Sequence, residues 1–300
     1  MKLPAMLAAA LLLSAGGCRF WYKPVPVANA IGEAETVLNG DTVNVHRDER
    51  FEIYGPNSEA VFDGYEQMNR AYRAFERHFR ARPPKFAVFL FQDSIVPLDA
   101  ATLKTVRDRG FLPMYYARPA SVRSRRRYGG LDYGGATWPI APTAARAMLA
   151  RFADEQLGND PRPDSVVLDR FPFWFRAAFL HLLGESGAFE RDLELVREKR
   201  ALWMPLKDLI VMVRPAPGDT LLDPSRRSEA DETTQLLAAQ ATTLGRFLVE
   251  REGAAVLGRL ARGYIANRPI AEMLTELRSG TRTVADLERT WQVWVATREN

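Results

Sequence analysis

Histidine is scarce in this chain, and the three histidines that it has stand far apart. They are His46, His78 and His181, so no two of them lie one helical turn apart in the sequence. A zinc site carried on a single helix uses two histidines at positions i and i+4. The sequence therefore excludes that kind of metal site in any register.

Cysteine is scarcer still, because Cys18 is the only one. A single cysteine excludes an intrachain disulfide, and it excludes zinc sites that use two or more thiolate ligands. The folded chain must therefore be held together by packing. Its 300 residues and 47% hydrophobic composition are enough for one large core or two smaller ones.

Long apolar runs are also missing. The most apolar stretch, residues 3–13, is shorter than the roughly 20 residues that a membrane-spanning helix needs. It follows Lys2 and precedes Ser-Ala-Gly-Gly-Cys18, a pattern that is typical of an export signal. The cysteine makes residues 1–17 resemble a lipoprotein signal peptide, which implies cleavage before Cys18 and attachment of palmitate and a lipid anchor there. The alternative is an ordinary secretory signal in which Cys18 has no role.

The residues after Cys18 predict where the chain resides. Arg19 stands where the sorting pattern for the inner membrane has Asp, so in a Gram-negative organism we expect an outer-membrane anchor facing the periplasm. Residues 18–40, with several prolines, are predicted to form a tether that leads to a domain at 41–300. The net charge of +4 is only mildly basic and no nucleic-acid motif is present, so we expect no nucleic-acid partner.

The domain is predicted to be α+β, with a small mixed sheet and helices in residues 41–141 and a mainly α-helical part in residues 142–300. Alternating apolar residues in 41–46 and 50–55 predict adjacent strands, and the apolar run at 86–91 predicts a buried strand. Apolar residues at three- and four-residue spacing predict a helix from Ser58 to about Ala81. Further helices are expected at 143–157, 172–185, 230–250, 254–265, 268–278 and 284–297.

Two of these helices, at 143–157 and 172–185, are interpreted as facing one cleft. The second begins at Pro172 and continues with Trp174 and Phe175. Here the chain resembles the peptidase MA-like domains, zinc metallopeptidases of the gluzincin type. In that family one helix reads HExxH, and a later segment reads roughly Pro-x-Trp-Leu-x-Glu-Gly. The resemblance extends over most of residues 45–297 and implies a zincin-like helical part.

The resemblance also implies where the site residues of the family would fall. The third zinc ligand would fall at Ala177, the two histidines at Arg151 and Glu155, and the water-activating Glu at Phe152. None of these has the chemistry that the family needs, so the resemblance implies a pseudo-metallopeptidase with neither metal nor cofactor. Arg151 and Glu155 are one turn apart and could form an ion pair instead.

Arginine is concentrated in the segment before the first cleft helix, which is also rich in Gly and Tyr. Guanidinium groups grip phosphate and carboxylate groups bidentately, so this segment predicts an anion-binding loop at the edge of the cleft. A solvated run of charge is the alternative. The arginines are Arg118, Arg123, Arg125, Arg126 and Arg127.

Three functions remain open on the sequence. We favour a binding or scaffolding role, in which the cleft and the Arg-rich loop take an anionic envelope ligand or another envelope protein. The alternative is a hydrolase or peptidase with a relocated site, in which His181, Glu185 and Glu155 hold a metal or share a proton. The third is a structural lipoprotein that acts through its C-terminal helices.

Overall fold

The computed structural model describes residue 31 and the ranges 34–91, 95–117, 140–158, 167–183, 186–214, 227–278 and 280–298. Side chains are described from 189 onward in the range 186–214 and from 232 onward in the range 227–278. The signal peptide with Cys18, most of the tether, the Arg-rich loop at 118–127 and Glu185 lie outside the described residues. Predictions on these segments therefore stay predictions. No helix in the described ranges is long and apolar enough to cross a membrane.

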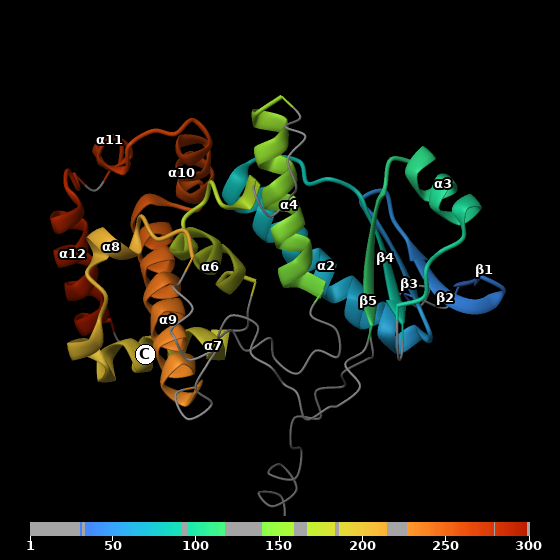
Figure 1. The fold of residues 1–300 in the computed structure, drawn as a ribbon, viewed down its shortest axis with the longest axis horizontal. Coiled ribbons are helices and arrows are strands. Elements are labelled where there is room, and N and C mark those ends of the chain that lie inside the picture. Colours follow the sequence, from blue (N-terminus) through green and yellow to red (C-terminus); the bar gives the residue numbers. More distant parts are fainter. Residues whose placement is uncertain are drawn as a thin grey trace, which may run out of the picture.

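The sheet has five strands in the order β1-β2-β3-β4-β5 (Figure 1). The first three strands pair antiparallel, and β3, β4 and β5 pair parallel. Sequence patterns predicted β2, β3 and β4, and these predictions are confirmed. The strands are β1 (Ala34–Leu38), β2 (Asp41–Arg47), β3 (Phe51–Gly55), β4 (Phe86–Phe91) and β5 (Leu112–Ala117).

The tether predicted for 18–40 extends too far, because β1 lies inside it. Residues 34–38 pair with β2 through a tight turn at Asn39 and Gly40. Both turn residues have positive φ values, 53° and 89°. Asn-Gly is the dipeptide that best fits a two-residue hairpin turn, and it was the signal for this strand.

Two helices connect the parallel strands and cover opposite faces of the sheet. Helix α2 (Ser58–Phe79) packs in the main core with Phe51 and Val88, whereas Val106 of α3 (Ala100–Asp108) packs with Phe89 on the other face. The predicted helix over 58–81 is confirmed. It begins where the side chain of Asn57 accepts from the backbone N–H of Ala60 at 2.9 Å, and it ends at Arg80 in the left-handed conformation.

The elements that the structure describes after β5 are all helical, which confirms the α+β class. Figure 1 shows the sheet on one side, α2 and α4 in the middle and the C-terminal helices on the other side. One large core contains residues of both parts. The elements are α4 (Ile140–Gln156), α6 (Phe173–His181), α7 (Ser186–Glu198), the 3-10 turn η1 (Arg200–Leu202), α8 (Leu206–Leu209), α9 (Arg227–Glu252), α10 (Val256–Ile265), α11 (Ile270–Thr275) and α12 (Val284–Thr297).

Helix α6, the second cleft helix, ends at His181, one turn before the predicted end at 185. It lies directly against α9, because a Cβ atom added at Gly245 would be 2.3 Å from the Cβ of Ala178. Real Cβ atoms do not approach so closely, so α9 needs glycine at this crossing. His181 lies on α6 and Thr242 on α9, so both belong to this pair of packed helices.

Candidate functional site

The α4–α6 helix pair is lined with aromatic side chains where the family resemblance implies a zinc site. Phe152, at the position of the water-activating Glu, is 4% exposed. Its ring packs edge-on against Phe79 at 5.2 Å and Phe75 at 6.1 Å between centroids. Phe79 in turn packs on Phe179 of α6 at 5.0 Å. This position therefore belongs to the core.

The remaining positions of the implied zinc site are also occupied without metal ligands. Ala177 is buried on α6, and Arg151 is half-buried on α4. The ion pair predicted between Arg151 and Glu155 is not the one observed, because Arg151 Nη1 donates to Asp154 Oδ2 at 3.1 Å. Asp154 is one residue closer and buried, whereas Glu155 is exposed. An ion pair that is partly shielded from solvent is screened less by salt than one between fully exposed groups.

His181, the centre of the alternative site, lies beside a carboxylate that the sequence analysis did not name. His181 is buried at the end of α6, and its Nδ1 lies 3.4 Å from Oδ2 of Asp192 on α7. Thr242 of α9 donates to the same carboxylate oxygen at 2.9 Å. Within the described ranges no group of three His, Cys, Asp or Glu side chains could hold a metal ion.

Sequence reasoning missed Asp192, although a signal was present. Phe189 lies three residues before Asp192 and Val196 four residues after it, and both are buried. Residues at this spacing lie on the same side of a helix, so Asp192 shares the inward face of α7. A carboxylate on an inward face needs a polar partner. His181 and Thr242 supply such partners from two other helices.

The imidazole of His181 is neutral at neutral pH. Burial lowers its pKa to about 4, and the positive charge of Arg246 acts in the same direction. Thr242 donates to the carboxylate oxygen of Asp192 that faces this imidazole. The pair is a histidine oriented by a carboxylate, which is a partial catalytic arrangement.

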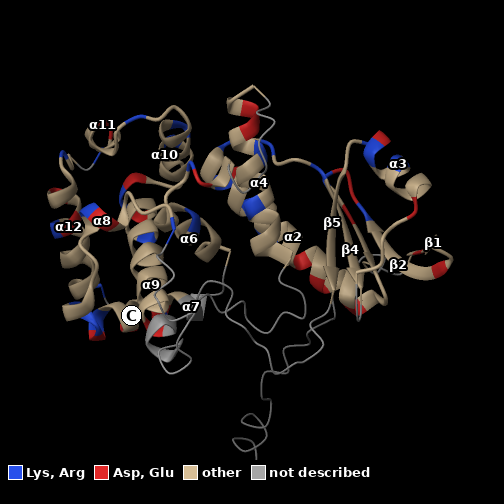
Figure 2. Ribbon diagram, in the orientation of Figure 1, with Lys and Arg blue, Asp and Glu red and all other residues tan. Residues whose placement is uncertain are grey.

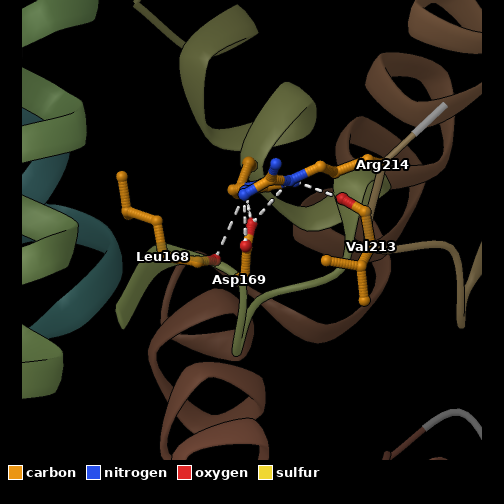
Figure 3. A network of polar contacts seen from close by, with 5 residues as sticks. Leu168, Asp169, Val213 and Arg214 are labelled. Atoms are coloured by element: carbon orange, nitrogen blue, oxygen red, sulfur yellow. Dashed lines mark hydrogen bonds and ion pairs between the residues drawn. The ribbon is translucent and has the colours of Figure 1, made fainter. Parts of the chain in front are cut away.

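A second network of polar contacts joins α6 to the residues just before it and to the residues after α8. Arg176 of α6 donates through Nη1 to Oδ1 of Asp169 at 3.2 Å and through Nη2 to the backbone carbonyl of Val213. Arg214 grips Asp169 with both Nε, at 3.2 Å, and Nη2. Figure 3 shows Asp169 facing Arg214, with the carbonyl oxygens of Leu168 and Val213 on either side. Two guanidinium groups thus share one carboxylate.

The charges of this group act on one another. Arg214, followed by Arg176, holds the pKa of the Asp169 carboxyl below its usual range. Burial lowers the pKa of Arg176, Asp169 opposes that shift, and the positive charges of Arg214 and Arg146 reinforce it. Arg146 belongs to α4, and Figure 2 shows basic positions on both α4 and α6. The charge of Arg176 is therefore opposed by two further arginines and stabilised by one carboxylate.

Comparisons with known proteins give no relative of this chain: no family model, no curated protein and no solved structure matches it. The resemblance to peptidase MA-like domains consequently rests on the residues of the two cleft helices.

Proposed function

We propose that this chain is a membrane-anchored envelope lipoprotein whose domain resembles a peptidase MA-like domain, has lost the zinc chemistry and serves to bind an anionic partner. The lipid would be carried by Cys18, and a Gram-negative chain would face the periplasm from the outer membrane. The ligand would be an anionic envelope component or an acidic envelope protein.

The observation that carries this proposal is the environment of Phe152. A catalytic Glu at that position would place a carboxylate against the rings of Phe75 and Phe79. An ionised carboxylate in hydrocarbon is very costly without a partner. The residue present suits its surroundings, and those surroundings suit packing better than water activation.

A binding role is supported by the charges around the same helices. The Arg-rich segment at 118–127 precedes α4 in sequence, and the positive charges of Arg146 and Arg214 act on Arg176. Clustered guanidinium groups favour phosphate and carboxylate ligands. Binding through these groups needs neither metal nor cofactor.

One observation favours the hydrolase alternative, and it is the contact between His181 and Asp192. A histidine oriented by a carboxylate can act as a general base when a nucleophile or water lies beside its other nitrogen. In this version Asp192 takes the place that was predicted for Glu155 and Glu185. The imidazole is 6% exposed, which limits the access of any substrate.

Proteolysis assays separate the two proposals. The purified full chain should not cleave an unfolded protein substrate, and neither added zinc nor a chelator should change that result. A contaminating protease is identified by equal cleavage in a His181→Ala sample. Cleavage that disappears in the His181→Ala variant would refute the binding proposal in favour of the hydrolase.

A further inference from the structure

Strand β1 forms one edge of the sheet and lies at its outer end, away from the helical part (Figure 1). The two-residue turn at 39–40 is closed by a hydrogen-bonded pair, 38 with 41, and bonded and non-bonded pairs alternate from there. The even-numbered residues of β1 therefore direct their backbone N–H and C=O groups toward β2. Glu35 and Val37 direct theirs outward, and no strand that the structure describes pairs with them.

The opposite edge of the sheet is protected against pairing, whereas β1 is not. Edge strands are commonly protected by proline, lysine or a bulge. In β5 the N–H of Leu112 donates to the carbonyl of Lys85 at 2.8 Å, so the nitrogen of the next residue, Pro113, lies on the outer side and cannot donate. Strand β1 reads AETVL and pairs with β2 over five consecutive residues without a bulge. It has none of these three protections.

Apolar side chains are exposed beside this free edge. Val37 is 67% exposed. Asn39, at the end of β1, donates to the carbonyl of Pro97 at 2.9 Å, which brings the preceding Ile95 and Val96 close to the same end, and both are exposed. Exposed apolar side chains at a free strand edge favour contact with another protein chain.

The outward groups of β1 match those of a second copy of this chain. In an antiparallel pair with its twofold axis at Thr36, Glu35 of each copy faces Val37 of the other. Residues that face each other in a bonded pair exchange two hydrogen bonds, so this register satisfies every outward N–H and C=O group of both residues in both copies. Thr36 faces its own counterpart, which is a favourable pair, and the two Glu35 carboxylates lie diagonally instead of opposite each other.

We infer that β1 is a dimerisation edge, through which two copies of this chain join their sheets into one continuous sheet with five strands from each copy. The chain's own tether is a poorer occupant, because Pro24 and Pro26 lack the N–H groups that a paired strand donates. The proposed lipid anchor favours the pairing: the roughly 15 residues between Cys18 and β1 span up to about 50 Å, so two anchored copies can meet on one membrane. The inference goes beyond the proposed function and does not require the anchor.

The register is tested by cross-linking in the full chain with Cys18→Ser, which has no other cysteine. Thr36→Cys in this background should form a disulfide-linked dimer on mild oxidation, because its Cα atoms would lie about 4.5 Å apart across the axis. Glu35→Cys is the matched control, since the two copies of this residue are offset and lie beyond the about 7 Å that a disulfide can bridge. Non-reducing electrophoresis should show several times more linked dimer for Thr36→Cys.

Sedimentation velocity at increasing chain concentration measures the dimer without a cross-link, and the parent chain should dimerise. Val37→Glu and Val37→Lys remove the same apolar side chain but place opposite charges against Glu35 of the second copy. Repulsion in the first variant and attraction in the second should separate their dissociation constants by about tenfold, with Val37→Glu the weaker dimer. Val37→Pro should also weaken the dimer without opening the hairpin, because the N–H that it removes points outward.

Three results would overturn the inference: a monomeric parent at every concentration, equal dissociation constants for Val37→Glu and Val37→Lys, or equal cross-linking of Thr36→Cys and Glu35→Cys. The first of these would leave the edge to a strand of a different protein. A melting curve shows whether Val37→Pro remains folded, and the two charged variants decide the question if it does not. A zinc-dependent activity would refute the proposed function while leaving the dimer untouched.

Discussion

Replacing Phe152 by alanine should lower the free energy of unfolding by about 3–5 kcal/mol, the usual loss for a buried phenylalanine. The ring is 4% exposed and packs on Phe75 and Phe79. Removing it leaves a cavity between α2 and α4 that neither helix can easily close. Urea denaturation of the purified chain measures this change.

The more informative variant is Phe152→Glu, which introduces the residue that peptidase MA-like domains have at the resembling position. It should destabilise the chain more than Phe152→Ala, because it adds an unpaired carboxylate to the cavity. Glu155→Ala, an exposed neighbour on the same helix, is the matched control and should change stability by no more than about 0.5 kcal/mol. If Phe152→Glu is as harmless as Glu155→Ala, then Phe152 faces an open cleft and the core assignment fails.

Acidification from pH 7 to pH 4 should destabilise the chain through His181. Its pKa is about 4 in the folded chain against 6.5 for a free histidine. Between these two pH values the unfolded chain binds more protons, so stability falls as the pH falls and levels off below about pH 4. The difference corresponds to roughly 3 kcal/mol at most.

The measurement is a set of urea denaturation curves across this pH range for the parent and for His181→Gln, which cannot titrate. The variant should have a flatter profile. Burial also lowers the pKa values of His46 and His78, so part of the slope should remain in the variant. Identical slopes in both proteins would mean that His181 does not carry the predicted cost.

The elements that sequence reasoning predicted are those with strong local patterns. Helix α2 has a continuous apolar stripe bounded by Asn57 and two prolines, and β4 is an uninterrupted apolar run. Strand β1 was missed because only five residues form it and because the apolar Val37 is exposed, so apolar residues do not mark one face of the strand. Its best signal was the Asn39–Gly40 turn, which was assigned to the tether.

The candidate site was harder to predict, because its parts meet only in three dimensions. Arg214 lies 45 residues from Asp169, and no periodicity connects them. Thr242 lies 50 residues from Asp192. By contrast, an ion pair of Arg151 within α4 was predicted, and only the partner differed. The sequence could not show that Asp154 is buried and Glu155 exposed, because that depends on what packs against the helix.

The proposed function requires that the two helices which resemble those of a zinc peptidase hold no metal, and the zinc content of the full chain measures this. The chain should be purified without chelator, incubated with zinc, dialysed and analysed by plasma mass spectrometry, with His181→Ala treated in parallel. If the proposal is right, both samples will contain far less than one zinc atom per chain. About one zinc per chain would contradict it, and loss of that zinc in His181→Ala would assign the metal to a site built on the histidine.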